Sequence, residues 1–158
     1  MAAPSELASA GSAAILYRGL SALPFFNPDV DHEPAPVGVA ERRGQISHAD
    51  AAVFSTPEYA GMLPGSLKHL LDWTVGSGFV SGKPVVWIIV AAPGRGLGAL
   101  ATLATVLGSI DVRILDEAYI DLPIARDMVQ PRAVATVPER DALARWWATM
   151  RGRLETSE

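Results

Sequence analysis

The feature that most constrains the fold is a continuous apolar run, Pro84–Ala92 (PVVWIIVAA). The run is rich in β-branched residues and shows no alternation of apolar and polar positions. In a strand with one face exposed to solvent, apolar and polar residues alternate. An unbroken apolar run therefore indicates a strand covered on both faces, as in parallel sheets. Helices must then lie on both sides of the sheet, which favours a three-layer, doubly wound α/β domain.

A second strand is predicted at the start of the stretch Ala51–Trp73 (AAVFSTPEYAGMLPGSLKHLLDW). Pro57 cannot donate to a strand ladder, so the strand should end before it. The loop Pro57–Gly61 follows, and then a helical segment with an apolar face. That face consists of Leu63, Leu67, Leu70, Leu71 and Thr74. Ligands bind at the carboxyl ends of strands in open parallel sheets, and backbone N–H groups beside a helix N-terminus suit an electron-rich or anionic ligand.

The same stretch carries a family signature. The strings Thr56–Gly61 (TPEYAG), Leu63–Gly65 (LPG) and Leu71–Trp73 (LDW), with Leu67-Lys68 between them, resemble that of the NADPH-dependent FMN reductase family. The resemblance extends more loosely from about Ala13 to Asp127. The alternative interpretation of these residues is an ordinary strand-to-helix loop of another α/β protein.

The resemblance implies a flavodoxin-like fold with FMN as cofactor and NADPH as electron donor. The partner would be a small-molecule electron acceptor such as a flavin, quinone, chromate or azo compound. Because the flavin carries the redox chemistry, no catalytic side chain and no metal site is expected. The resemblance also implies a homodimer or homotetramer that associates through the helices flanking the first loop, with Trp73 and Trp146 buried at the interface.

The resemblance places FMN between two loops. The expected cofactor-binding residues are Pro57, Glu58, Tyr59, Ala60 and Gly61 in the first loop and Pro93, Gly94, Arg95 and Gly96 in the second. Tyr59 is expected to border the ring, and Glu58 and Ala60 to offer main-chain N–H groups near its polar edge. Arg95 is expected to meet the flavin or the NADPH phosphates, or simply to be exposed. The family often has Asn at the position of Ala60, so this chain lacks one side-chain donor there.

The glycine-rich segment Pro93–Gly98 (PGRGLG) is not a dinucleotide fingerprint. That fingerprint needs Gly-x-Gly-x-x-Gly after the first strand, with an acidic residue about twenty positions on. Here the spacing is Gly-x-Gly-x-Gly and the strand is a later one. A helix over Ala99–Leu107, closed by Gly108, is expected to follow.

The N-terminal part departs from the family pattern. In the family, a segment like Leu23–Asp29 (LPFFNPD) follows the second strand, and a Gly-Ser-Leu-Arg string after the first strand holds the flavin phosphate. That string occurs nowhere in this sequence. We expect a truncated chain that lacks the first strand, with residues 1–12 a remnant of the first helix or disordered. The alternative is a shortened variant in which a strand Ala13–Tyr17 pairs directly with Ala52–Ser55.

The remaining pattern predicts a weak helix over Val37–Ala49, a last strand broken between Val112–Leu115 and Tyr119–Leu122, and a final helix. Thr136–Glu139 forms a capping box for that helix. Its apolar stripe is expected to be core or subunit contact and comprises Leu143, Trp146, Trp147, Met150 and Leu154. Residues 1–158 are expected to form one domain.

Composition excludes several classes of function. The chain has 158 residues, a net charge of −4, no basic run and no cysteine. Nucleic-acid binding is therefore not favoured, and thiolate chemistry and disulfides are excluded. No apolar stretch reaches the ~20 residues of a membrane span and no signal peptide is evident, so a cytoplasmic protein without a membrane partner is expected.

Two other functions stay open. One is a non-catalytic flavodoxin-like binding or interaction module, which is favoured if the N-terminus is genuine, because the phosphate-binding string is then absent. The other is a hydrolase that uses Ser66 or Ser55 with His69, although no Gly-x-Ser-x-Gly elbow occurs and no acid is placed to orient the histidine. Ser47, His48 and Asp50 are read as a solvated helix end.

Overall fold

A computed structural model describes residues 13–76, 78–124 and 137–156 of the chain. Its sheet has the order β1-β2-β3. The strands are β1 (Ala52–Thr56), β2 (Pro84–Ala91) and β3 (Arg113–Pro123). Both neighbouring pairs are parallel. The expectation of a parallel sheet is therefore confirmed.

The central strand is the run that the sequence analysis singled out. Every side chain from Val85 to Ile89 is buried. The ladder to β1 runs in unbroken register from Ala52–Val85 to Thr56–Ile89. The continuous apolar pattern thus reports burial on both faces, as expected for the middle of a parallel sheet.

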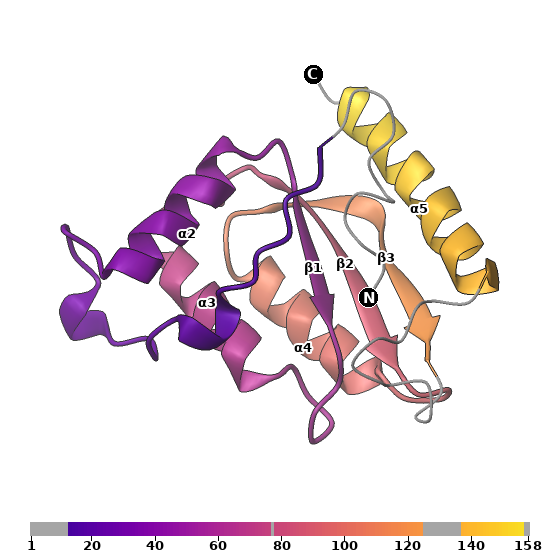
Figure 1. Cartoon of the computed structure of the whole chain (residues 1–158), viewed down its shortest axis with the longest axis horizontal. Coiled ribbons are helices and arrows are strands. Elements are labelled where there is room, and N and C mark those ends of the chain that lie inside the picture. The colour runs from indigo at the N-terminus through magenta and orange to yellow at the C-terminus, as the bar shows by residue number, and fades with distance from the viewer. Residues whose placement is uncertain (1–12, 77, 125–136, 157–158) are drawn as a thin grey trace.

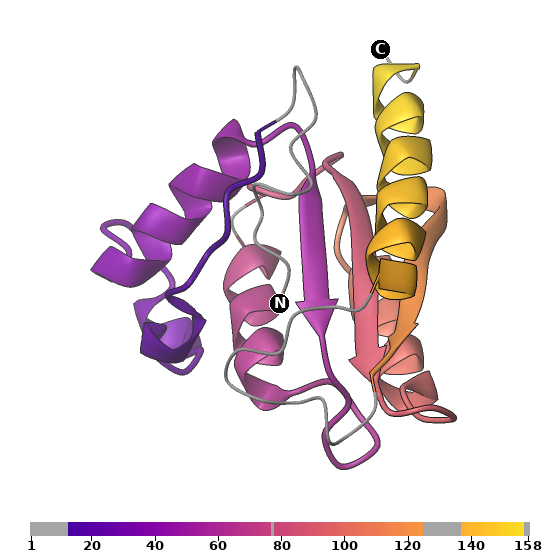
Figure 2. The ribbon, with the colours of Figure 1, turned by 45° about the vertical axis from the view of Figure 1, so that its right-hand side comes forward.

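Helices cover the sheet on both sides. They are α2 (Val37–His48), α3 (Gly65–Val75), α4 (Leu97–Gly108) and α5 (Val137–Glu155). Figures 1 and 2 show α3 and α4 behind the sheet and α5 on the opposite face, over β3, with α2 stacked outside α3. Two short 3₁₀ turns, η1 (Leu20–Ala22) and η2 (Pro28–Val30), precede α2. The fold is thus the expected doubly wound arrangement.

The core lies mainly between the sheet and α3 and α4. The predicted apolar face of α3 is confirmed, because Leu67, Leu70, Leu71 and Thr74 are all buried. On α5, the predicted stripe contains Met150, which is fully buried, and Trp146 and Trp147, which are half-buried against the core. The expected N-cap of α5, Thr136, lies outside the described residues.

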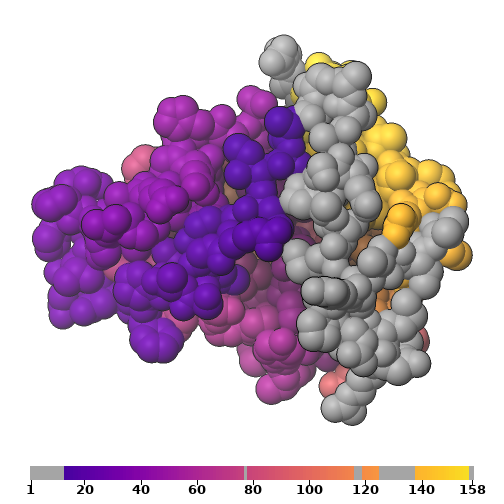
Figure 3. Space-filling view, viewed as in Figure 1, coloured from indigo at the N-terminus to yellow at the C-terminus, as the bar shows by residue number. Residues whose placement is uncertain are grey.

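The strand expected at Ala13–Tyr17 is wrong. Residues 13–19 have no regular secondary structure and pair with no described strand, and Ile15 is 83% exposed. In the space-filling view this segment, in indigo, lies directly against the surface of α2 (Figure 3). Among the described residues β1 pairs with β2 alone, so the direct pairing with Ala52–Ser55 is wrong too. Strand geometry is favourable when a neighbouring strand supplies hydrogen bonds, and this short, exposed segment packs on a helix instead.

The last strand is irregular rather than broken. Its register with β2 jumps from Val85–Ile114 to Trp87–Tyr119, so several residues of β3 bulge out opposite Val86. The predicted break between Leu115 and Tyr119, which contains Asp116 and Glu117, falls in this bulge. A bulge lets one strand carry extra residues while the ladder continues on both sides of it.

The expected interface role of Trp73 is wrong. Its side chain is 1% exposed and its Nε1 donates to the carbonyl of Pro24 at 3.0 Å. Phe26 packs edge-on against the same ring, with a centroid distance of 5.0 Å. Trp73 therefore anchors the N-terminal segment to α3 within one chain and offers no surface to a partner subunit.

Two neighbouring buried arginines of α2 differ sharply in their partners. Arg43 bonds to the Asp31 carboxylate and donates to the Trp73 carbonyl at 3.0 Å, one of the unpaired carbonyls at the C-terminus of α3. Arg42 lies over the Tyr17 ring, and its Nε and Nη2 have no partner among the described residues. Burial lowers the pKa of Arg42, an effect that Tyr17 opposes.

These two residues give a matched test. Arg43→Met leaves a carboxylate with 15% side-chain exposure and a helix carbonyl without their donor, so we expect it to lower the free energy of unfolding by about 3 kcal/mol. Arg42→Met removes a poorly paired buried charge, and we expect a change within about 1 kcal/mol, or a gain. Urea unfolding measures both; equal losses would contradict this account of Arg43.

Candidate functional site

Two loops meet at the carboxyl edge of the sheet. The first joins β1 to α3 over residues 57–64, and the second joins β2 to α4 over residues 92–96. Both leave the tips of the parallel arrows in Figure 1 and lie at the same end of the molecule. This edge is where open α/β sheets bind their ligands.

The first loop contains a tight turn. Tyr59 and Met62 exchange two backbone hydrogen bonds of 3.0 Å, which leaves Ala60 and Gly61 as the central pair. Their φ angles are +51° and +74°. Positive φ at both central positions is the mark of a type I′ turn, for which Asn-Gly is the favoured pair. Ala60 therefore holds a left-handed conformation that its methyl group disfavours.

The second loop depends on glycine at two points. Gly96, with φ of +102°, is the N-cap of α4, and a Cβ there would lie 2.8 Å from Ile89 Cγ2. Gly98, in the first turn of α4, approaches the first loop so closely that a Cβ would lie 1.8 Å from the carbonyl oxygen of Gly61. The two loops are thus in backbone contact at Gly98 and Gly61.

A single carboxylate ties the loops together. Glu58 Oε2 accepts hydrogen bonds from the backbone N–H of Gly96 at 3.1 Å and of Gly98 at 2.9 Å. Its Oε1 lies 3.4 Å from Arg95 Nε, and the Glu58 side chain is only 9% exposed. A negative charge at the N-terminus of a helix is favourable, because the first N–H groups lack partners and the helix dipole is positive there.

The structure brings together the nine residues expected to border the flavin, but these residues differ in how exposed they are. Tyr59 is 65% exposed, and Pro93, Gly94 and Arg95 are exposed beside it, whereas Gly96 is buried. No hydrogen bond within the described part of the chain uses the backbone N–H of Glu58, Ala60 or Gly94. They are therefore candidate donors to a ligand.

Sequence reasoning missed the side chain of Glu58 and the role of Gly98. Glu58 is separated from its two backbone donors by 38 and 40 residues, so no local pattern connects them. The third glycine of PGRGLG was the one available signal, since a glycine in a helix N-terminus often marks a close approach. Two apolar side chains, Met62 (57% exposed) and Leu97 (75% exposed), also flank the turn.

The residues of the alternative sites are engaged elsewhere. His69 Nδ1 lies 3.5 Å from the backbone N–H of Phe26, and its ring packs edge-on against Phe25. It therefore secures the N-terminal segment to α3. His48 contacts the carbonyl of Gly44 one turn back and is exposed, as expected for a helix end. In residues 13–76, 78–124 and 137–156 no group of His, Cys, Asp and Glu has the geometry of a metal site.

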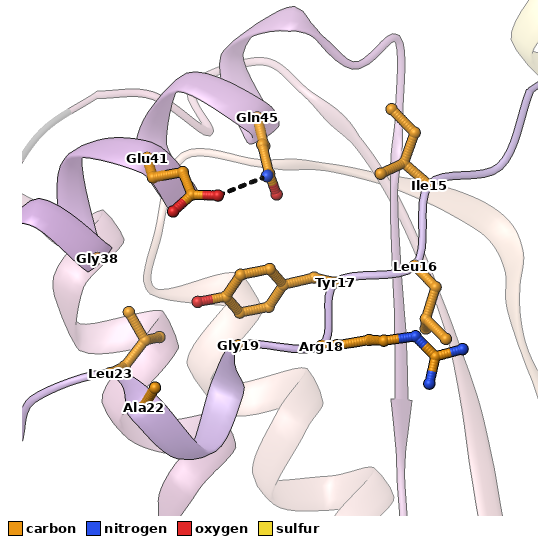
Figure 4. A pocket seen from close by; sticks show the side chains of 10 residues that line it. All are labelled: Ile15, Leu16, Tyr17, Arg18, Gly19, Ala22, Leu23, Gly38, Glu41 and Gln45. Atoms are coloured by element: carbon orange, nitrogen blue, oxygen red, sulfur yellow. Dashed lines mark hydrogen bonds between the residues drawn. The ribbon is translucent and has the colours of Figure 1, made fainter.

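A surface hollow of about 320 Å³ lies apart from both loops. Figure 4 shows it between the segment 15–23 and α2, with Tyr17 across its middle and Glu41 bonded to Gln45 at one side. Its lining includes no residue of either loop. Among the described helices, none is long and apolar enough to span a membrane.

Comparison with known proteins places this site in a family context. The model of the family described as NADPH-dependent FMN reductase matches residues 5–127. A quinone reductase of Pseudomonas putida is 34% identical over 123 residues, which cover 73% of this chain and 65% of the relative. An NAD(P)H-dependent FMN reductase of Pseudomonas aeruginosa is 40% identical over 78 residues, or 48% of this chain and 42% of that protein. The chain thus spans less than two thirds of these relatives.

Solved structures share the fold. The flavoenzyme FerB, an NAD(P)H:acceptor oxidoreductase of Paracoccus denitrificans, superposes with a TM-score of 0.57 at 26% identity, over 82% of this chain and 78% of FerB. An NADH:FMN oxidoreductase (EMOB) in its apo form gives a TM-score of 0.60 at 20% identity, over 84% and 69% of the two chains. A WrbA-like flavodoxin of Agrobacterium tumefaciens gives 0.58 at 18% identity, over 73% and 72%. The flavodoxin-like architecture is confirmed.

The strained turn yields a prediction. Ala60→Asn places the residue that tolerates left-handed backbone at the first central position, so we expect the free energy of unfolding to rise by about 1 kcal/mol. In thermal unfolding this is a shift of about 2–4 °C for a chain of this size. Ala92→Asn is the control, because Ala92 is also an exposed loop alanine but has no positive φ. A loss of stability in Ala60→Asn would contradict the type I′ geometry.

The contact between the loops yields a second prediction. Alanine normally stabilises a helix relative to glycine, by up to about 1 kcal/mol, and we expect that gain for Gly152→Ala in α5, where a Cβ meets nothing within 4 Å. Gly98→Ala instead forces the loops apart, and we expect a loss of about 3 kcal/mol. Urea unfolding of the two variants compares them directly. Similar gains in both would show that the loops are not in backbone contact.

Proposed function

This chain belongs to the NADPH-dependent FMN reductase family, and from that membership we propose that it passes electrons from NADPH through bound FMN to a small acceptor. The observation that carries the proposal is the pair of loops at the carboxyl edge of the sheet, held together by Glu58. The loops combine an exposed aromatic ring with backbone donors that have no partner in the described chain.

The residues of the two loops fit the ring end of FMN. A planar, partly polar ring needs an apolar surface beside backbone donors, and Tyr59 lies next to the N–H groups of Glu58 and Ala60. Gly94 leaves open space where a Cβ would project, which allows backbone to approach a flat ligand. The N-terminus of α4 is already occupied by the Glu58 carboxylate, so we do not assign the flavin phosphate to it.

FMN, when bound, would accept hydride from NADPH and pass the electrons to the acceptor. The chain's own residues position the reactants. The Tyr59 ring covers apolar ring surface, and the N–H groups of Glu58 and Ala60 donate to the polar edge. Arg95, 67% exposed, offers a cation at the rim that suits the phosphates of the electron donor.

The acceptor class that we propose first is a quinone, since relatives from Pseudomonas putida and Escherichia coli are named quinone reductases. Flavin, chromate and azo compounds remain proposals of the same kind, as does a cytoplasmic location. We also propose a homodimer or homotetramer. Its interface would include the exposed Tyr59, Met62 and Leu97 around the site, in place of the buried Trp73.

The test is a titration of the purified chain with FMN, followed by flavin fluorescence, and then anaerobic addition of NADPH. We expect a dissociation constant of about 1 μM or below, which corresponds to about 8 kcal/mol of binding free energy, and loss of the flavin's visible absorbance on addition of NADPH. Quinone added next should restore that absorbance. Sedimentation of the same sample reports the oligomeric state.

Riboflavin serves as the matched control ligand. The contacts that we assign are to the ring, so we expect riboflavin to bind within about tenfold of FMN, or 1.4 kcal/mol. Failure of both flavins to bind would overturn the reductase proposal for this chain. The non-catalytic binding module would then be the better account. Binding of FMN without reduction by NADPH would also favour that module.

A further inference from the structure

The Glu58 side chain has an unusual environment for a carboxylate next to a candidate binding loop. It is 9% exposed, and both oxygens are engaged, Oε2 by the N–H groups of Gly96 and Gly98 and Oε1 by Arg95 Nε at 3.4 Å. Oε2 thus accepts from two backbone donors, and Oε1 is paired with the Arg95 side chain. The side chain therefore points into the base of the second loop, while its backbone N–H has no hydrogen-bond partner among the described residues.

The bonds of Glu58 join two elements that follow different strands of the sheet. The residue sits in the loop after β1, and its two backbone donors form the N-cap and first turn of α4, after β2. Hydrogen bonds from N–H groups to a carboxylate are stronger than those between neutral groups, and burial from water strengthens them further. Together with the contact of Gly98 on Gly61, they set the separation of the two loops.

We propose that Glu58 is a positioning residue that sets the gap in which the flavin ring is held. It acts through the N-terminus of α4 and not through contact with the flavin, and the inference rests on the proposed function. A ring inserted between two loops gains from both only if their spacing matches its thickness. Affinity should therefore depend on the reach of the Glu58 side chain and its acceptor oxygen, more than on its negative charge.

Two substitutions separate reach from charge. Glu58→Gln keeps the length of the side chain, and its amide oxygen accepts the same two N–H bonds without a charge. Glu58→Asp keeps the charge but is shorter by one methylene, about 1.5 Å, so its carboxylate does not reach both N–H groups. The control for loss of a carboxylate is Glu155→Gln, whose residue is 70% exposed and pairs with Arg151 on α5, away from both loops.

Three measurements read the outcome. Amide hydrogen exchange of Gly96 and Gly98, measured by NMR without flavin, reports whether the carboxylate protects these N–H groups. The FMN dissociation constant reports whether the spacing of the two loops still suits the flavin ring. The visible circular dichroism of the saturated complex reports the environment of the ring, which a change in global stability alone would not move. All are made at a temperature at which each variant is folded by far-ultraviolet circular dichroism.

We expect Glu58→Asp to speed exchange of both glycine amides and to weaken FMN binding, each by at least about tenfold, and to alter the visible circular dichroism. Glu58→Gln should stay within about threefold of the unsubstituted chain in both, and Glu155→Gln should be indistinguishable from it. Should the aspartate variant not fold, Glu58→Ala takes its place with the same expectation.

The opposite ranking, with aspartate retaining affinity and glutamine losing it, would assign the role to charge and overturn the inference. Faster amide exchange in Glu58→Asp without weaker FMN binding would overturn it as well, by showing that the link does not set the gap. If the unsubstituted chain binds no flavin, the proposed function and the positioning role fall together. If it binds flavin and all variants match it, the positioning role alone falls.

Discussion

The burial of β2 on both faces is the constraint from which the rest of this structure follows. A strand with no wet face must be flanked by strands on both edges and by helices above and below. Parallel neighbours require long crossovers, and these are the helices α3 and α4. Because parallel strands all end at the same edge, the loops after β1 and β2 emerge side by side. The candidate site is thus a consequence of how the core is covered.

What converts two adjacent loops into one site is a set of backbone contacts. Gly98 allows the first turn of α4 to touch Gly61, and the Glu58 carboxylate satisfies the N–H groups that the start of the helix leaves unpaired. Satisfying these groups within the chain has a consequence for binding. The helix N-terminus that would attract an anion is occupied by the Glu58 carboxylate, and the N–H groups without a partner among the described residues lie in the two loops, at Glu58, Ala60 and Gly94.

The periphery is held by different means. Arg43 links α2 to Asp31 and to the C-terminus of α3, while Trp73 and His69 fasten the N-terminal segment to α3. Three side chains, two on α3 and one on α2, thus hold the peripheral elements in place, as strand pairing holds the sheet together. On β1, Phe54 is buried against the helices, whereas Val53, on the opposite face, is 42% exposed. The described part of the sheet is therefore covered on both faces from Val85 to Ile89 of β2 and only partly at β1.

The sequence by itself determined the elements that depend on local pattern. The runs at 84–92 and 51–73 predicted β2, β1, α3 and the apolar face of α3, because burial imposes a periodicity that single residues obey. The family signature predicted that the loops after β1 and β2 hold the cofactor, and the structure shows that these two loops meet at the carboxyl edge of the sheet. Ala13–Tyr17 was misjudged as a strand because a short apolar run does not reveal whether a neighbouring edge will pair with it.

Only the tertiary structure decided how the two loops are joined. The partners of Glu58 lie 38 and 40 residues away, and the burial of Trp73 depends on Pro24 and Phe26, which approach it from a distant part of the chain. Such contacts leave no period in the sequence, since they depend on where the ends of separate elements arrive once the core has closed. The residues of the site are local in sequence, whereas the geometry that makes them a site is not.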